Sequence, residues 1–195
     1  MAGGISDRKR QRNRRETRIG AGAERGDVAG YGANTEVALR TFCHSDQDVV
    51  FDALRSEELA RCLAALPVPV DDAGCALYLR FLTDPNVTCR VVTLNGRFAG
   101  VLSLGTELTF WICSELHGAG ICHQALRQFL ALPEVRSGAG PLIACCLTDN
   151  NAAAAVLRKV GFVQVGQPFR RYSFAEAAPV LFQRYCRDCQ IINLS

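Results

Sequence analysis

The chain has 195 residues, 49% of them hydrophobic, which is enough for one domain with a buried core. Its ten cysteines stand mostly singly inside apolar runs, and no secretory signal opens the chain. These features argue against a disulfide-rich secreted protein and favour a reduced, intracellular one that uses cysteine as a small core residue. No apolar run approaches the ~20 residues of a membrane helix, so no membrane partner is expected, and the formal net charge is only +3.

The positive charge is concentrated at the N-terminus. Residues 1–34 contain eight basic and four acidic residues, a net charge of +4, which leaves a net charge of −1 for the remainder of the chain. The net charge of that remainder therefore gives no reason to expect nucleic-acid binding. The Arg-rich run RKRQRNRR and the Gly/Ala-rich stretch after it have almost nothing to bury, so they predict a disordered tail. Such a tail is typical of a nuclear-import signal, an RNA- or ribosome-contacting arm or a transit peptide. A solvated tail, or a start codon assigned too far upstream, explains it equally well.

The remainder, residues 35–195, is predicted to fold as one domain that begins with a strand and three helices. These first elements are expected over residues 36–42, 49–54, 57–66 and 73–82. Asp46, Ser56 and either Asp71 or Asp72 precede the three helices and are the residues expected to cap them, and Asn150 or Asp149 is expected to cap the later helix over 151–160.

Strands and helices then alternate to the end of the chain. Asn95-Gly96 predicts a tight hairpin, because this dipeptide suits positive φ in a type I′ turn. The elements expected here are hairpin strands over 87–94 and 97–104, a strand over 107–113, a helix over 121–132, a strand over 141–147, a helix over 151–160 and extended segments over 162–166, 170–174 and 180–186. This order predicts an α+β domain with a mixed central β-sheet flanked by helices.

The stretch LHGAGICHQA, residues 116–125, stands between a predicted strand and a predicted helix. A helix start offers unpaired N–H groups and partial positive charge, so an anion is stabilised there. Gly118 and Gly120 carry no Cβ and let the backbone approach that anion closely. The stretch is neither GxGxxG nor GxxxxGK[ST], and an ordinary strand-to-helix turn explains the glycine pair by itself.

A second motif follows one helix and one strand later, and the two together resemble the GNAT superfamily of acyl-CoA-dependent N-acyltransferases. The closest resemblance is to the RimJ/RimL-type branch, which modifies protein N-termini and some small amines. That branch has a cofactor loop of approximately W-G-[RKQ]-G-[YI]-[AG]-[TS]-E-A, here HGAGICHQA at residues 117–125, and a later motif of approximately [DE]-N-x-A-S-x-x-V-L-x-K-x-G-F, here DNNAAAAVLRKVGF at residues 149–162. With the Asn95-Gly96 hairpin in collinear order, the resemblance covers roughly residues 36–186.

The resemblance implies acetyl-CoA as the co-substrate, with no metal. Main-chain groups at the end of the strand over 107–113 would pair with the pantetheine arm, the glycine loop would hold the diphosphate, and Asn150 would lie near the thioester end. The expected cofactor-binding residues are Trp111, Ile112, Cys113, His117, Gly118, Ala119, Gly120, Ile121, Cys122, His123 and Asn150.

Several positions depart from the family pattern. Ala119 replaces a basic residue or glutamine, and Gln124 replaces a glutamate, in a loop that acts mostly through backbone amides in the family. Ala153 stands at the serine of the later motif, and Leu157 stands where many relatives have a tyrosine that protonates the leaving thiolate. A coenzyme A thiolate is already a reasonable leaving group, so the chain is expected to tolerate this loss.

Glu107 is the candidate general base. Alternation places it on the strand face of Thr109 and Trp111, and its counterpart in the branch lies near the acceptor site. An exposed strand glutamate without a catalytic role explains it as well, since a base contributes only ~10²–10⁴-fold. His117 and His123 flank the loop and could touch a phosphate, or could be solvated histidines of a helix start.

The cysteines suggest two further hypotheses. Cys186 and Cys189 form a lone CxxC, but a structural zinc site generally needs four ligands and no second pair stands at a suitable spacing. Cys122 lies at a predicted helix N-terminus, which could lower its pKa. Packing is the simpler role for Cys122, because the family transfers the acyl group directly.

The sequence therefore predicts an N-acetyltransferase that moves the acetyl group of acetyl-CoA to a primary amine, either a protein N-terminus or a small amine. It is expected in the cytoplasm, with the nucleus as an alternative because of the Arg-rich tail. Two other readings stay open. One is an acyl-CoA-binding module that has lost catalysis, and the other is a ribosome- or nucleic-acid-associated protein that binds through residues 1–34.

Overall fold

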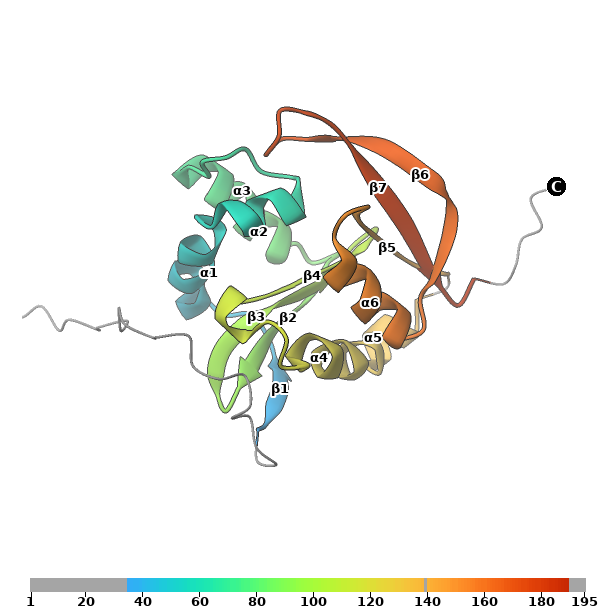
Figure 1. The fold of residues 1–195 in the computed structure, drawn as a ribbon. Coiled ribbons are helices and arrows are strands. Elements are labelled where there is room, and N and C mark those ends of the chain that lie inside the picture. The colour runs from blue at the N-terminus through green and yellow to red at the C-terminus, as the bar shows by residue number, and fades with distance from the viewer. Residues whose placement is uncertain (1–34, 139, 190–195) are drawn as a thin grey trace, which may run out of the picture. The chain divides into compact units, whose positions relative to one another are not determined.

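The computed structural model describes residues 35–138 and 140–189, which are organised around one seven-stranded sheet (Figure 1). Its strands lie in the order β1-β2-β3-β4-β5-β7-β6, and neighbours are antiparallel except for the parallel pair β4 and β5. The strands are β1 (Val37–Arg40), β2 (Thr88–Leu94), β3 (Arg97–Leu104), β4 (Leu108–Ile112), β5 (Leu142–Leu147), β6 (Val163–Ser173) and β7 (Ala178–Arg187). The predicted α+β class with a mixed central sheet is confirmed. The predicted disordered tail, residues 1–34, lies outside the described residues.

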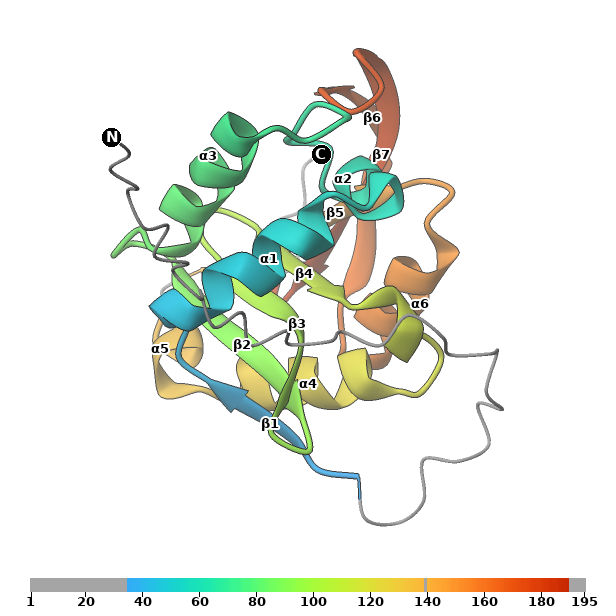
Figure 2. The ribbon, with the colours of Figure 1, turned by 90° about the vertical axis from the view of Figure 1, so that its left-hand side faces the viewer.

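Helices cover both faces of the sheet (Figures 1 and 2). On one face lie α1 (Gln47–Leu54), α2 (Glu57–Leu63) and α3 (Asp72–Leu82), and on the other lie α4 (Ile121–Leu130), α5 (Pro133–Arg136) and α6 (Asn151–Lys159). Two short 3-10 helices, η2 (His44–Asp46) and η3 (Ser114–Leu116), precede α1 and α4 respectively. Each face has its own apolar core: Tyr78 of α3 and Trp111 of β4 lie in the first, Phe129 of α4 and Leu157 of α6 in the second.

Three of the predicted helix caps are confirmed. Ser56, Asp71 and Asn150 each accept a hydrogen bond from a main-chain N–H three residues later, which satisfies one donor that the first turn leaves unpaired.

The predicted cap at Asp46 is wrong. The Asp46 carboxylate accepts two hydrogen bonds from the Arg40 guanidinium, at 2.6 and 2.7 Å, and one from the main-chain N–H of Cys43, and it makes no cap bond to α1. These hydrogen bonds, above all those from Arg40, lower the pKa of Asp46 to about 2. An ion pair formed by the fold has replaced the local cap.

The predicted hairpin is also confirmed, since β2 pairs with β3 around Asn95 and Gly96, which have φ of 50° and 77°. Its second strand approaches β4 so closely that a side chain at Gly100 would not fit. A Cβ there would lie 2.2 Å from the carbonyl oxygen of Trp111 and 2.9 Å from Cα of Ile112. Gly100 therefore fixes the position of the carboxyl end of β4.

Several boundaries differ from prediction. The strand expected from Glu107 begins at Leu108, the helix expected to residue 132 ends at Leu130 with α5 as a separate turn, and two segments predicted apart form the single strand β6 with an irregular register between Val165 and Phe169. Among the residues that the structure describes, no helix is both long and apolar enough to cross a membrane.

Candidate active site

A gap opens between the two parallel strands in the middle of the sheet. Strands β4 and β5 share a single residue pair, Leu108 with Ala144, and diverge from there toward their carboxyl ends. The N–H of Cys113 donates to the carbonyl of Ala99 at 2.9 Å. Because main-chain polar groups alternate in direction along an antiparallel pair, those of Trp111 and Cys113 point to β3 and those of Phe110 and Ile112 point into the gap.

The glycine loop lies at the open end of this gap. Gly118 and Gly120 have φ of 81° and 75°, values that glycine adopts without strain, and Gly120 is the N-cap of α4. No side chain of residues 35–138 or 140–189 caps α4, and a Cβ built at either glycine meets none of their atoms within 4 Å. The first-turn N–H groups of α4 are therefore unobstructed by side chains, as an anion site at a helix start requires.

The other loop residues divide between packing and contact. Ile121 is buried in the core, and Ala119 and Cys122 pack against it. Burial raises the pKa of the Cys122 thiol to about 12, so the hypothesis of a helix start that lowers this pKa is wrong. Desolvation, which disfavours the charged thiolate, is the cause of this rise. His123 is half-buried in the first turn of α4.

His117 connects the loop to β4. Its Nε2 lies 2.9 Å from the carbonyl oxygen of Ile112 and donates to it in the Nε2–H tautomer. Since the main-chain groups of Ile112 face the gap, the imidazole lies beside the edge of β4 that would have to receive a pantetheine arm.

Asn150 follows the carboxyl end of β5, on the same edge of the sheet as the loop. Its Oδ1 accepts the Ala153 N–H at 2.9 Å as the cap of α6, and its Nδ2 lies 3.5 Å from Sγ of Cys62 in α2. Because β4 and β5 are parallel, the glycine loop and Asn150 follow the same edge of the sheet. The cofactor is predicted to bind at this edge.

The other end of the gap holds a cluster of polar side chains. Glu107, which adjoins the closing pair Leu108–Ala144, receives two hydrogen bonds from the Arg171 guanidinium of β6, at 2.7 and 3.0 Å, and one from the Cys145 thiol of β5 at 3.5 Å. The Arg171 guanidinium holds the pKa of the Glu107 carboxyl below its usual value, although partial burial raises it. An ionised carboxylate held in this way is a weaker base than a free glutamate.

Sequence reasoning missed Arg171 and Cys145. They lie 64 and 38 residues from Glu107, and no motif links them. Alternation along β5 predicts that Cys145 lies on the opposite face of the sheet from Ala144 and Cys146. Nothing in the sequence predicts that Arg171 of β6 reaches the start of β4.

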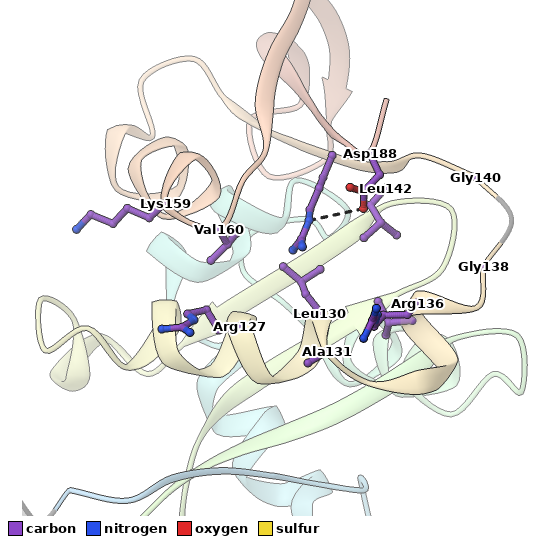
Figure 3. Close-up of a pocket in the computed structure, with 12 residues that line it drawn as sticks. Arg127, Leu130, Ala131, Arg136, Gly138, Gly140, Leu142, Lys159, Val160 and Asp188 are labelled. Carbon is purple, nitrogen blue, oxygen red and sulfur yellow. Dashed lines mark ion pairs between the residues drawn. The ribbon is translucent and has the colours of Figure 1, made fainter. Parts of the chain in front are cut away.

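A surface hollow of about 710 Å³ lies at the opposite end of α4 (Figure 3). Its lining includes Arg127, Arg136 and Lys159, together with the Arg187–Asp188 ion pair of 3.7 Å. No predicted cofactor or catalytic residue lines it. The hollow is therefore separate from the gap between β4 and β5.

Cys186 and Cys189 of the CxxC lie next to each other with Cα atoms 6.1 Å apart, a separation at which a disulfide can form. The other eight cysteines are free. Within residues 35–138 and 140–189, no group of three or more histidine, cysteine or acidic side chains is arranged to hold a metal ion.

Comparisons with known proteins agree with this fold. Solved structures that share the fold include RimL, a ribosomal L7/L12 alpha-N-protein acetyltransferase in complex with coenzyme A, with a TM-score of 0.64 and 17% identity over 77% of this chain and 93% of that one. Spermidine N-acetyltransferase from Vibrio cholerae, in complex with CoA and spermine, has a TM-score of 0.65 and 16% identity over 77% and 94%. The Salmonella typhimurium acetyl transferase that modifies the N-terminal serine of L7/L12 has a TM-score of 0.63 and 16% identity over 77% and 94%.

No curated protein sequence matches the chain. The family model described as the acetyltransferase (GNAT) domain matches residues 36–163, which is well over half of the 195 residues. The collinear motifs, the gap between the parallel strands and the uncapped glycine loop lie in this segment or at its edge. This chain belongs to the GNAT acetyltransferase family.

Proposed function

We propose that this protein transfers the acetyl group of acetyl-CoA to a primary amine, either a protein N-terminus or a small amine. The observation that carries the proposal is the N-terminus of α4, which follows Gly118 and Gly120 in positive φ and faces the open end of the gap without a side-chain cap. Family membership supports an acyl-CoA ligand for that place.

The loop main chain from Gly118 to Cys122 is the proposed seat of the diphosphate, because its N–H groups and the helix dipole both favour negative charge. Along the gap, the main-chain groups of Phe110 and Ile112 are proposed to pair with the amide groups of the pantetheine arm as a neighbouring strand would. His117 stays on Ile112 at the mouth of the gap, and Asn150 borders it from the β5 side.

The polar cluster at the closed end of the gap is the proposed place of transfer. The neutral amine attacks the thioester carbonyl, an N–C bond forms, the C–S bond breaks, and the amine proton passes to water or to the leaving thiolate. Glu107, ionised by its pairing with Arg171, accepts a hydrogen bond from the amine and orients it. A protein N-terminus has a pKa near 8 and needs little further help from a base. Positioning supplies most of the rate.

Acetyl-CoA binding tests whether the uncapped N-terminus of α4 is the diphosphate site. At about 100 times its Kd, acetyl-CoA should raise the melting temperature of the wild-type protein by roughly 5–10 °C. Gly118→Glu should abolish the rise, because it places a carboxylate over the diphosphate site.

Gly96→Glu is the matched control. Gly96 has nearly the same φ, 77° against 81°, and an equally open surrounding in the described part of the chain, but it lies in the β2–β3 turn. Its substitution should cost similar stability and leave the acetyl-CoA shift intact. Loss of the shift in both variants, or in neither, would overturn the proposed site.

A binding module without catalysis is the second candidate. Leu157, which takes the place of the family's tyrosine, is fully buried in the core, and Ala153 carries no polar group. No side-chain acid is therefore available at either of these positions. Release of free thiol from acetyl-CoA in the presence of amines separates the two candidates, since a binding module releases none.

The cytoplasmic or nuclear location and the RNA or ribosome contact through residues 1–34 stay predictions from the sequence. Deletion of residues 1–34 tests the contact, because it should remove a steeply salt-dependent affinity for RNA.

A further inference from the structure

The polar cluster at the closed end of the gap includes a second arginine, Arg184 of β7. Strand register places Arg184 opposite Cys145, and Phe182 opposite Phe169, so these four side chains share one face of the sheet. The next residue, Tyr185, belongs to the core beneath α4 and α6. Arg184 therefore faces the other way, toward the side that α1, α2 and α3 cover.

The two arginines of this face stand over the same aromatic ring. The guanidinium carbons of Arg184 and Arg171 lie 5.1 and 5.4 Å from the ring centre of Phe169, and that of Arg171 also lies 5.2 Å from the ring centre of Phe182. The rings hold both cations next to Glu107 and Cys145, whose strands meet at the closing pair of the gap.

The charges of this cluster do not cancel. Glu107 is engaged by Arg171 in a two-point ion pair. For Arg184, no carboxylate in residues 35–138 or 140–189 lies within ion-pair distance. One carboxylate and two guanidiniums leave a net charge of +1 at the point where the acceptor must approach.

Three other carboxylates, those of Glu176, Glu58 and Asp149, interact with groups other than Arg184. Glu176, in the β6–β7 turn, pairs with Arg61 of α2 at 2.5 Å. Glu58 and Asp149 raise the pKa of the Cys62 thiol, and this thiol contacts Asn150 beyond the carboxyl end of β5. None of the three neutralises Arg184 at the closed end of the gap.

We propose that the acceptor of the transfer carries a carboxylate close to its amine and that Arg184 binds this carboxylate. This inference rests on the proposed function and narrows its substrate. The amine meets Glu107 and the acid group meets Arg184, with Phe169 and Phe182 as the apolar floor between them. Acidic peptide N-termini and free acidic amino acids both have this chemistry. A polyamine such as spermidine does not, because its further charges would meet Arg184 and Arg171.

Acceptor competition in the full-length protein tests the inference through thiol release from acetyl-CoA. Three peptides that differ only in a second residue of Glu, Gln or Lys are compared with free glutamate and spermidine. The Glu peptide should exceed the Lys peptide in kcat/KM by about three- to tenfold, mainly through KM, with spermidine the poorest acceptor. The ratio between the Glu peptide and free glutamate separates the two sources of the carboxylate.

Charge reversal identifies the residue responsible. Arg184→Glu should invert the preference between the Glu and Lys peptides, and Arg184→Gln should abolish it. Arg170→Glu is the matched control, because Arg170 lies on the neighbouring strand but on the opposite face from Arg171, and it should keep the wild-type preference. An acetyl-CoA-induced rise in melting temperature equal to that of the wild type shows that each variant is folded and binds the co-substrate.

The outcomes separate this inference from the proposed function. Thiol release that is independent of acceptor charge, or a preference that Arg184→Glu leaves unchanged, overturns the acidic acceptor and leaves acetyl transfer standing. Absence of release with every acceptor, while acetyl-CoA still raises the melting temperature, overturns transfer and the acceptor class with it.

Discussion

The two ends of the gap between β4 and β5 are built in different ways. The open end is made of consecutive residues, and its geometry depends on the main chain: two glycines in positive φ and the first turn of α4. The closed end is made of side chains from segments far apart in the sequence, because Glu107 meets Cys145 across 38 residues and Arg171 across 64.

This difference explains which departures from the family pattern are tolerable. A main-chain N–H is present in every residue except proline, so Ala119, Cys122 and His123 leave the donors of the loop in place. At the closed end, charge and shape belong to particular side chains, and a substitution there removes the interaction itself. Changes of side chain at the loop positions other than Gly118 and Gly120 should therefore cost little, and changes at the closed end should cost much.

The largest effect is expected from a substitution that displaces β4, because both ends of the gap depend on the position of this strand. Gly100→Ala places a methyl group 2.2 Å from the Trp111 carbonyl oxygen, so the strands must separate, and unfolding in urea should show a loss of about 2–4 kcal/mol. Gly105→Ala is the control, because its nearest atom would be a methyl of Val87 at an ordinary 3.4 Å, and it should change stability by less than ~1 kcal/mol. Equal losses in the two variants would contradict the close approach of β3 to β4.

Removal of Arg171 breaks the closed end alone. Arg171→Leu leaves Glu107 half-buried without its partner, and kcat/KM for transfer should fall by about 10–100-fold while the acetyl-CoA-induced shift in melting temperature persists. Arg171→Lys should recover only part of the activity, because an ammonium cannot make the two-point contact. A drop in acetyl-CoA affinity as large as the drop in kcat/KM would show that the two ends are not independent.

The pH dependence of the same variant has a definite sign. Arg171 lowers the pKa of Glu107 in the folded protein, so the ion pair stabilises the fold above the usual glutamate range and is lost only as the pH falls through the lowered value. Without Arg171 the carboxylate protonates at higher pH. The acid limb of the kcat/KM profile should therefore move to higher pH in Arg171→Leu, and an unmoved limb would assign it to another group.

The sequence was informative where the structure is local. Apolar periodicity, the Asn95-Gly96 turn and the caps at Ser56 and Asn150 depend on neighbours within a few residues, and the structure confirms them. The glycine loop could be found for the same reason. The contacts of Glu107 with Arg171 and Cys145 form only when strands far apart in the sequence assemble, and nothing in the neighbouring sequence encodes these partners.

The smallest effect should come from the cysteine of the loop. Cys122→Ala should change kcat/KM by less than about twofold, because the amide of residue 122 remains and the partly buried thiol, with its pKa raised to about 12, is not available as a nucleophile. For the same reason, iodoacetamide at pH 8 should label exposed Cys43 well before Cys122, as peptide mass mapping can measure. A large loss of activity in Cys122→Ala with acetyl-CoA binding intact would mean that the open end also works through a side chain, and the contrast between the two ends would then be wrong.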